Sequence, residues 1–481
     1  MKLKDLLRGA PIVSVCADGE LEITGISCDS RTTRPGELFV AITGETEDGE
    51  CFITEALAKG AACILCRHSL QKTIPHAVAD SCRRALAVLS ANWFDHPAKE
   101  LTLVGVTGTN GKTTSTYLIK RILEEQYGAK VGLIGTICNW VGDRPLPTER
   151  TTPDPYRLHQ LLRQMADGGC THAVMEVSSH ALAMDRVYGI RFAAALFTNL
   201  TQDHLDYHHT MEAYCDAKAR LFASCDLAVY NKDDPWAQRL LQSSTCRRYS
   251  YGFAAAELTA KDVILTSDGV RFTAQTEQEA QAVRVPIPGR FTVYNALAAM
   301  AVCHNLGVPL SACAQTLCFH RGAKGRMEVV PTPHKPYTVL IDYAHTPDAL
   351  ENVLRAVKGF AKGRTVALFG CGGDRDRTKR PQMGEIAARL ADFSVVTTDN
   401  PRTERPMDII ADIVQGMDGA AYQVIENRTE AIRWALDHGE KDDVIVLCGK
   451  GHEDYQEVGH QKLHLDEREV VAEYLRDPLP Q

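Results

Sequence analysis

The residue types and spacing between positions 105 and 114 can bind phosphate. This stretch is Gly-Val-Thr-Gly-Thr-Asn-Gly-Lys-Thr-Thr. Its glycines let backbone N–H groups turn toward an anion, which the start of a following helix also faces. Lys112 is placed to reach the terminal phosphates of a nucleotide, and Thr113 to offer its hydroxyl to Mg²⁺. A glycine-rich turn without a ligand is the alternative, and Val106 departs from the generic pattern. The Lys-Thr pair after the last glycine favours the phosphate site.

An acid and a histidine follow two later strands of the same region. Short apolar runs predict a mostly parallel sheet covered by helices; they span residues 131–136, 172–177, 193–198 and 227–230. Ligands of such sheets gather beyond the carboxyl ends of the strands, where Glu176 and His204 stand. Taken singly, each residue would be a cap or a surface hydrogen-bonding group. Together with Thr113 they predict a Mg²⁺ or Mn²⁺ site beside phosphates.

Lys218 stands in the apolar stripe of a predicted helix over residues 212–224. Helical spacing places it on one face with Tyr214, Leu221 and Phe222. The ordinary explanation is a lysine whose stem is buried while its ammonium group reaches water. The alternative is a buried lysine with a lowered pKa and a nucleophilic amine. Such an amine can react with CO₂ to form a carbamate, an anionic metal ligand.

The last third of the chain predicts a second α/β sheet without a second phosphate loop. Its apolar runs span residues 338–341, 365–369, 394–397 and 444–447, and a dense polar loop follows each. Arg375, Arg402 and Glu453 lie in these loops. Guanidinium groups pair bidentately with carboxylates, so these loops suit a ligand that has carboxylates and a free ammonium. Separate surface salt bridges are the alternative.

Length and composition bound the class of protein. A chain of 481 residues predicts three domains, with boundaries at 1–98, 99–323 and 324–481. A net charge of -8 argues against a nucleic-acid partner. Charged residues near the start argue against a signal peptide, and no apolar run nears the roughly 18 residues of a membrane span, so we expect a cytoplasmic protein. We also expect a monomer. The 16 cysteines are scattered, which favours reduced thiols over disulfides or zinc.

Motifs along nearly the whole chain resemble the Mur ligase family, which builds the peptide of peptidoglycan. They lie at residues 107–114, 176–182, 198–208, 217–222, 342–347, 370–376 and 449–456. The leading motifs at 29–31 and 35–41 are similar to those of the members that add the third residue. The resemblance implies an α/β protein with a small N-terminal UDP-substrate domain, a central P-loop ATP-binding domain and a C-terminal Rossmann-like amino-acid-binding domain.

The resemblance also implies a reaction. An ATP-dependent ligase would phosphorylate the D-glutamate carboxylate of UDP-N-acetylmuramoyl-L-alanyl-D-glutamate, and the amine of meso-diaminopimelate would displace phosphate from the acyl phosphate. The sequence Asp399-Asn400-Pro401-Arg402 is similar to that of members choosing diaminopimelate. The alternatives are the same step with L-lysine or another diamino acid, a folate-polyglutamate ligase, or a nucleotide-dependent switch.

Site residues follow from the same resemblance, position by position. ATP contacts are implied for Gly108, Thr109, Asn110, Gly111, Lys112, Thr113, Thr114, Asn295, Arg326 and Asp342; Asn295 could instead be a polar residue near a helix start. The metal centre is implied for Thr113, Glu176, His204 and carbamylated Lys218, with Lys112 as the catalytic cation. Contacts to the UDP-substrate are implied for Cys28, Ser30, Glu45, Thr46, Glu47, Thr151, Thr152, Ser178, Met184 and Arg186, and contacts to diaminopimelate for Arg375, Asp399, Asn400, Pro401, Arg402, Gly449 and Glu453. Cys28, Arg150 and Met184 depart from the residues common in relatives.

Overall fold

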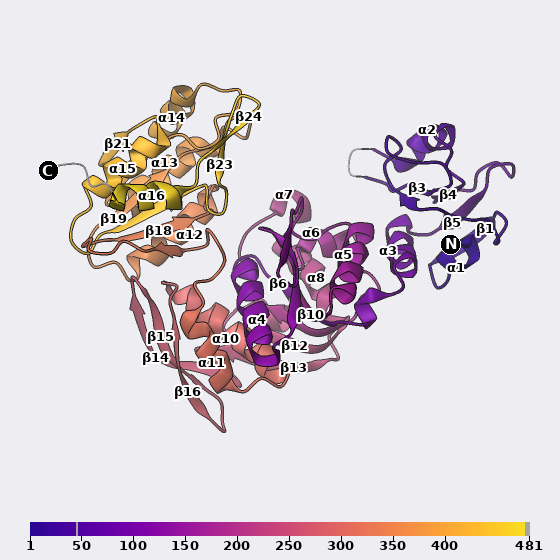
Figure 1. Cartoon of the computed structure of the whole chain (residues 1–481), viewed down its shortest axis with the longest axis horizontal. Coiled ribbons are helices and arrows are strands. Elements are labelled where there is room, and N and C mark those ends of the chain that lie inside the picture. Colours follow the sequence, from indigo (N-terminus) through magenta and orange to yellow (C-terminus); the bar gives the residue numbers. More distant parts are fainter. Residues whose placement is uncertain (45–46, 477–481) are drawn as a thin grey trace. The chain divides into compact units, whose positions relative to one another are not determined.

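The computed structural model describes residues 1–44 and 47–476. The chain divides into two compact units, Met1–Ser250 and Tyr251–Gln481, and Figure 1 labels most of their helices and strands. The three-part division with boundaries near 98 and 323 stays a prediction.

Unit 1 begins with a small sheet in the strand order β1-β5-β4-β3-β2. Its apolar strands are buried because helix side chains cover them, among them Leu86 and Leu89 of α3 and Leu6 of α1. Ser81 caps α3 by accepting a hydrogen bond from the Arg84 N–H group. The elements are α1 (Leu3–Leu6), β1 (Ile12–Cys16), β2 (Ile26–Ser27), β3 (Leu38–Val40), η1 (Gly49–Phe52), α2 (Ile53–Ala58), β4 (Cys63–Cys66), β5 (His76–Ala79), α3 (Cys82–Trp93) and η2 (Pro97–Lys99).

The rest of unit 1 is built on a sheet with the strand order β12-β11-β6-β10-β7-β8-β9. Strands β12 to β7 in this order are parallel, which confirms the predicted mostly parallel sheet. The elements are β6 (Thr102–Thr107), α4 (Lys112–Tyr127), β7 (Lys130–Ile134), β8 (Asn139–Val141), β9 (Arg144–Leu146), α5 (Pro155–Asp167), β10 (Cys170–Glu176), α6 (Ser179–Ala183), β11 (Phe192–Phe197), α7 (Leu205–His208), α8 (Met211–Phe222), β12 (Cys225–Asn231) and α9 (Ala237–Leu240); β13 (Arg247–Gly252) spans the point where the units divide.

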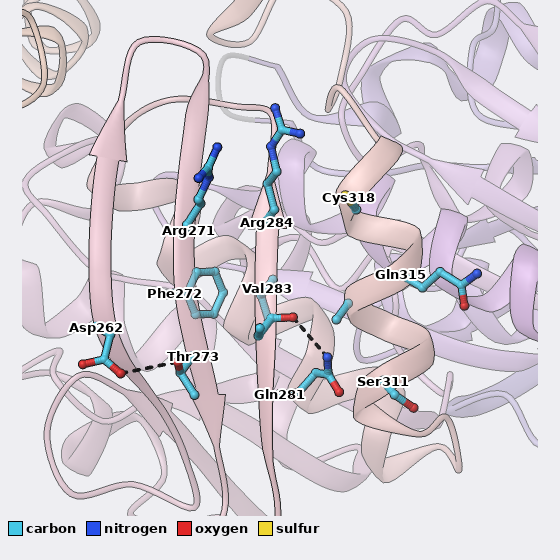
Figure 2. A pocket seen from close by; sticks show the side chains of 12 residues that line it. Asp262, Arg271, Phe272, Thr273, Gln281, Val283, Arg284, Ser311, Gln315 and Cys318 are labelled. Atoms are coloured by element: carbon cyan, nitrogen blue, oxygen red, sulfur yellow. Dashed lines mark hydrogen bonds between the residues drawn. The ribbon is translucent and has the colours of Figure 1, made fainter.

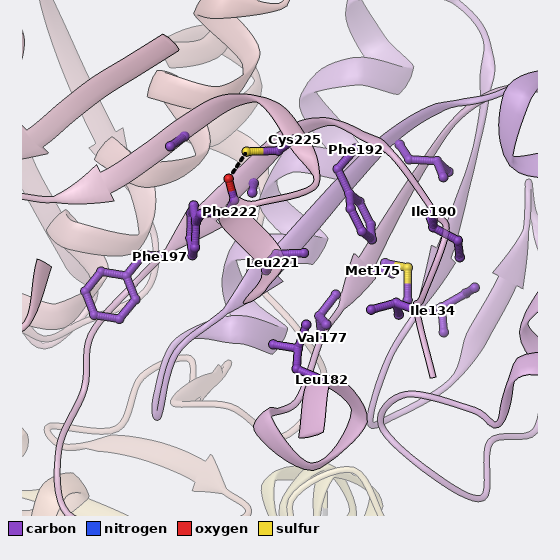
Figure 3. Close-up of a cluster of buried hydrophobic side chains, with 14 of the residues drawn as sticks. Ile134, Met175, Val177, Leu182, Ile190, Phe192, Phe197, Leu221, Phe222 and Cys225 are labelled. Atoms are coloured by element: carbon purple, nitrogen blue, oxygen red, sulfur yellow. Dashed lines mark hydrogen bonds between the residues drawn. The ribbon is translucent and has the colours of Figure 1, made fainter. Parts of the chain in front are cut away.

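A cluster of apolar side chains joins α8 and α6 to this sheet. Figure 3 shows Leu221 with Phe192 and Leu182 in it. A Cβ atom at Gly105 in β6 would lie 3.0 Å from the Phe192 ring and 3.1 Å from a Leu221 methyl carbon. Gly105, which stands one place before the position that the generic phosphate-loop pattern asks for, therefore lets α8 pack closely on β6. This close packing of α8 on β6 determines the position of α8 relative to the phosphate loop that follows β6.

Unit 2 contains an antiparallel ribbon and a second α/β sheet. Strands β14, β15 and β16 pair antiparallel. The sheet has the order β17-β18-β22-β19-β20-β21, parallel except for β17, and the α/β class is therefore confirmed. The bounds are β14 (Leu258–Thr266), β15 (Gly269–Gln275), β16 (Ala280–Val285), α10 (Arg290–Asn305), α11 (Leu310–Phe319), β17 (Glu328–Val330), β18 (Thr338–Asp342), α12 (Pro347–Lys358), β19 (Thr365–Phe369), α13 (Lys379–Leu390), β20 (Phe393–Val396), α14 (Pro406–Val414), β21 (Tyr422–Val424), α15 (Arg428–Asp437), β22 (Val444–Cys448), β23 (Tyr455–Val458), β24 (Gln461–His464) and α16 (Glu467–Arg476).

Helices cover the parallel sheet of unit 2 with apolar side chains. Ile432 and Leu436 of α15 and Val471 of α16 are buried in one cluster with the strands. None of the helices within residues 1–44 and 47–476 is both long enough and apolar enough to cross a bilayer.

Candidate functional site

The phosphate loop lies between β6 and α4 and has a fixed backbone. Gly108 has φ +151, and a Cβ atom there would lie 1.8 Å from Thr198 Oγ1, so only glycine fits. The segment after β11 holds the loop: Thr198 Oγ1 donates to Asn110 O (2.6 Å), and Asn110 N donates to Asn199 Oδ1 (2.9 Å). Sequence reasoning did not assign a role to Asn199, whose only signal was its place after a strand.

The first residues of α4 direct polar groups toward this loop. Lys112 Nζ donates to the carbonyl oxygens of Gly108 and Thr109, both at 2.9 Å. Thr113 Oγ1 donates to Glu176 Oε2 at 3.0 Å. Glu176 is fully buried at the end of β10 and also accepts from Thr136 N (2.9 Å) and Thr136 Oγ1 (3.1 Å). The structure thus brings the predicted Lys112, Thr113 and Glu176 to one end of the sheet.

Lys218 is buried along with the rest of its helix face. Its side chain is 1% exposed, so the ammonium group does not reach water. Nζ donates to Gly108 O at 2.9 Å and lies 4.4 Å from the centre of the Tyr214 ring. Burial lowers the pKa of Lys218 well below its usual value, and the positive charge of Lys112 lowers it further. The explanation in which the stem of Lys218 is buried while its ammonium group reaches water is therefore wrong. The side chains packed around this face of α8 exclude solvent from the ammonium group.

His204 belongs to a group of rings beside Lys218. Its ring lies 4.8 Å from the His180 ring and 6.1 Å from the Tyr214 ring. Burial lowers the pKa of His204, which favours the neutral imidazole that a metal prefers. No group of three or more His, Cys, Asp or Glu side chains within residues 1–44 and 47–476 could hold a metal by itself. Thr113 and Glu176 fit a Mg²⁺ ion held mainly by phosphates, which needs few protein ligands.

Residues predicted to contact the UDP-substrate form a connected set next to Glu176. Thr152 Oγ1 donates to the Glu176 carbonyl oxygen at 2.9 Å, and Ser178 N donates to Thr152 Oγ1 at 3.1 Å. Arg186 Nη1 donates to Thr152 O (2.8 Å), and Nη2 lies 3.4 Å from Met184 Sδ. The Thr151 hydroxyl is 3.0 Å from that of Thr136. These predicted residues come from the segments before α5, after β10 and after α6, and the hydrogen bonds of Thr152 join the three segments.

Met184 and Arg186 line a cavity of about 690 Å³ inside unit 1. Cys28, which follows β2, lines it too, as do Arg150, which departs from the residue common in relatives, and two arginines that sequence reasoning did not single out, Arg34 and Arg83. Only the fold shows that they share one space, which Asp29, Glu37 and Asp154 also line. Ser30 does not line the cavity; its hydroxyl donates to Glu55 Oε2 at 2.6 Å. Of the predicted loop 45–47, Glu45 and Thr46 lie outside the described residues, and Glu47 is exposed.

In unit 2, three residues predicted to contact the nucleotide lie on different elements. Asp342 ends β18, is buried, and accepts from Met327 N at 2.8 Å. Burial raises its pKa, and the charge of Arg326 opposes that shift. The Arg326 guanidinium lies 5.2 Å from the Tyr343 ring centre. Asn295 lies within α10 and is buried. A nucleotide role for these three residues stays a prediction.

The loops after β20, β22 and β19 bring together the residues predicted for diaminopimelate. Asn400 Nδ2 donates to Glu453 Oε2 at 3.1 Å. Arg402 Nε pairs with Glu457 Oε2 at 2.8 Å, and Nη1 donates to Gly373 O at 2.9 Å. A Cβ atom at Gly372 would lie 3.0 Å from Arg402 Nη1 and 3.9 Å from Arg375 Cγ, so both arginines flank this loop. Sequence reasoning missed Glu457, whose partner is 55 positions away.

A separate pocket of about 470 Å³ lies over β15, β16 and α11 of unit 2. Figure 2 shows Arg271, Arg284, Gln315 and Cys318 around it. None of the residues predicted to bind a substrate or nucleotide lines it.

Family models match three consecutive parts of the chain. The Mur ligase family catalytic domain matches residues 22–108, the Mur ligase middle domain residues 106–303, and the Mur ligase glutamate ligase domain residues 325–451. The chain belongs to the Mur ligase family. Membership confirms the resemblance stated from the motifs.

Individual Mur ligases are similar over the full length. The UDP-N-acetylmuramoyl-L-alanyl-D-glutamate--2,6-diaminopimelate ligase 1 of Clostridium acetobutylicum is 45% identical over 99% of this chain and 100% of its own. The enzyme of that type from Caldanaerobacter subterraneus is 44% identical over 99% of both chains. A solved structure of such a ligase has a TM-score of 0.74 at 33% identity and covers 100% of both chains.

More distant structures share the fold alone. The MurF ligase of Thermotoga maritima in complex with ADP has a TM-score of 0.60 at 19% identity, covering 95% of this chain and 97% of its own.

Proposed function

We propose that this Mur ligase joins meso-diaminopimelate to UDP-N-acetylmuramoyl-L-alanyl-D-glutamate in an ATP-dependent reaction. The observation that carries this is the full-length match, at 45% identity, to a ligase named for 2,6-diaminopimelate. The loop Asp399-Asn400-Pro401-Arg402, built against Glu453 in unit 2, supports it.

The unit 1 site suits phosphoryl transfer from ATP to a carboxylate. The loop between Gly108 and Lys112 presents N–H groups to phosphates, and the Lys112 ammonium offsets charge on the transferred group. Bound Mg²⁺, held by Thr113, Glu176 and His204 together with the phosphates, would supply further charge neutralisation. Attack of the D-glutamate carboxylate on the γ-phosphorus gives an acyl phosphate and ADP. The diaminopimelate amine then attacks the acyl carbon, phosphate leaves, and the amine loses a proton.

The chemistry of Lys218 fits a carbamate. A lowered pKa leaves a larger fraction of Nζ as a neutral amine, and the amine adds to CO₂ to give a carbamate and a proton. Carbamylation would replace a buried amine beside Lys112 with an anion, which is a better neighbour for both Lys112 and a metal ion.

Arg402 is the group that suits the distal carboxylate of diaminopimelate, which L-lysine lacks. Its Nε and Nη1 atoms are held by Glu457 and Gly373, so the guanidinium has a fixed orientation and can direct Nη2 to a ligand. With L-lysine the carboxylate partner would be missing, and a site built for a polar group discriminates strongly against a ligand that lacks it.

The decisive experiment is a product assay read by mass. Purified protein receives ATP, Mg²⁺, the UDP-dipeptide and either meso-diaminopimelate or L-lysine. The proposal expects the diaminopimelate adduct with ADP and phosphate. Equal use of L-lysine would favour the lysine-adding alternative. ATP hydrolysis indifferent to both substrates would favour a nucleotide-dependent switch. In a parallel assay with tetrahydrofolate and L-glutamate, turnover that requires tetrahydrofolate would favour a folate ligase.

A further inference from the structure

Lys450 is a fully buried lysine in the loop that follows β22. It is 0% exposed and stands between Gly449 and Gly451, two residues from the carboxyl end of the strand. A buried ammonium group is costly unless charged and hydrogen-bonding partners surround it. The partners of Lys450 therefore indicate what it does.

Those partners are residues that are predicted above to bind the diamino acid. Lys450 Nζ donates to Asn400 Oδ1, and its distances to Glu453 Oε2 and Asp399 Oδ1 are 3.2 Å and 3.8 Å. The Tyr455 ring centre lies 5.6 Å from Nζ. One ammonium group thus joins the loop after β20 to the loop after β22.

Lys450 fixes the orientation of the Asn400 amide. An ammonium group has only donors, so the atom that faces it must be the amide oxygen. Glu457 N also donates to Asn400 Oδ1, at 2.8 Å. Asn400 Nδ2 is then directed to Glu453 Oε2 at 3.1 Å, and the two ligand-binding side chains hold one another in place.

An acceptor remains beside this arrangement. Asp399 Oδ2 is buried and has no hydrogen-bond partner within residues 1–44 and 47–476. A Cβ atom at Gly449 would lie 2.3 Å from it, so the absence of a side chain at position 449 leaves room for this oxygen. Glu453 Oε1 accepts from the Tyr343 hydroxyl at 3.5 Å. Two carboxylates thus keep acceptor capacity for a ligand ammonium while Lys450 binds their other oxygens.

We propose that Lys450 is a positioning residue for the diamino acid: it does not contact the ligand but sets the side chains of Asn400 and Glu453 and balances their charge. This inference rests on the proposed function of the unit 2 loops. A lysine that serves stability alone is the competing explanation, and it predicts that all substrates and the melting temperature are affected together.

The test compares Lys450→Gln and Lys450→Arg with the wild type and with Lys462→Gln. Lys462 is the control because it is exposed, lies in the hairpin of β23 and β24 that follows the Lys450 loop, and pairs loosely with Glu457 at 3.8 Å. We expect the KM for meso-diaminopimelate to rise about 10- to 100-fold in both Lys450 variants, the effect of losing a hydrogen bond to a charged group. The KM values for ATP and the UDP-dipeptide, and the thermal shift on adding ADP, should stay near the wild-type values.

Each outcome decides between the explanations. Unchanged KM for diaminopimelate in both variants overturns the positioning role. A parallel rise of all three KM values, or loss of cooperative melting in both variants, assigns Lys450 to stability and also overturns it. A wild-type protein that makes no diaminopimelate adduct refutes the proposed function instead, so the two failures are distinguishable.

Discussion

Lys218 shows how burial changes the chemistry of a side chain. The same amine on an exposed helix would be an ammonium ion, but here packing against Tyr214 and the phosphate loop favours the neutral form. The carbamate hypothesis follows from that environment, and the reactivity belongs to the site more than to the residue type.

Replacing Lys218 tests the carbamate. We expect Lys218→Ala to lower kcat by about 100-fold or more, the scale of a lost electrostatic group at a reacting centre. Short carboxylic acids such as formate should restore part of the activity. A ¹³C carbamate signal should appear in wild-type protein supplied with labelled CO₂ and be absent from the variant. The exposed Lys232 provides the control, Lys232→Ala; full activity of Lys218→Ala would contradict the hypothesis.

Replacing Arg402 tests whether its guanidinium group determines the preference for diaminopimelate over L-lysine. Arg402→Ala should raise the KM for meso-diaminopimelate by about 100-fold, because a charge-assisted pair is lost. The weaker activity with L-lysine should change far less, so the preference between the two amino acids narrows. Arg433→Ala, at an exposed position with a 3.6 Å pair to Glu473, is the control. An unchanged preference would assign the distal carboxylate to another residue.

At the scale of elements, Glu404 fastens the loop after β19 to the loop after β20. Its carboxylate accepts from Arg380 Nη2 (2.8 Å), from Asp374 N (2.6 Å) and from Arg377 Nη2 (2.7 Å). The buried Arg380 holds the pKa of Glu404 at about 2, below its ordinary 4.5. The ionised carboxylate therefore holds together the two loops that carry Arg375 and Arg402.

The stability that Glu404 contributes depends on pH. A carboxyl group with a depressed pKa stabilises the fold above its unfolded pKa, and this contribution is lost as the pH falls from about 4.5 to about 2. Glu404→Gln should lower the melting temperature by about 5 °C near neutral pH. The difference from the wild type should shrink on acidification through that window. Glu385→Gln, on the exposed side of α13, should show no such trend in thermal melts.

Substitutions at two glycines near β22 and β23 distinguish the effect of backbone strain from the effect of a methyl group placed against the diaminopimelate site. Gly449 has φ +113 and faces Asp399 Oδ2, whereas Gly459 has φ +60 and open space on the side where a Cβ atom would stand. Gly459→Ala should cost about 1 kcal/mol of stability and leave activity intact. Gly449→Ala should raise the KM for diaminopimelate at least about 10-fold, since a methyl group displaces the Asp399 carboxylate. Equal effects of the two substitutions in kinetics would refute the role of Gly449.

At the scale of the whole molecule, most residues proposed for phosphoryl transfer lie in Met1–Ser250, and the residues proposed for the attacking amine lie in Tyr251–Gln481. Asn295, Arg326 and Asp342, which are predicted to contact the nucleotide, also lie in the second unit. Activation of the carboxylate and its capture by the amine should therefore be separable by mutation.

Hydroxylamine, which traps acyl phosphates as hydroxamates, measures this separation. Glu453→Gln should lower formation of the diaminopimelate product by about 100-fold but leave hydroxamate formation from ATP and the UDP-dipeptide largely intact. Lys112→Met should abolish both products, because it removes a cation from the phosphoryl-transfer site. Loss of the hydroxamate in Glu453→Gln would show that the unit 2 loops are also needed for activation.

The sequence alone determined the phosphate loop, the parallel sheets, the family and the residues at the strand ends, because these depend on local periodicity and on contiguous motifs. The tertiary structure alone decided the burial of Lys218, whose partner Gly108 is 110 positions away, the contacts of Lys450 and Glu404, and the gathering of arginines around the unit 1 cavity. Helical and strand periods report which face is buried. They do not report which polar atom, distant in the sequence, contacts that face. In these sites such contacts determine the protonation and the orientation of the buried side chains.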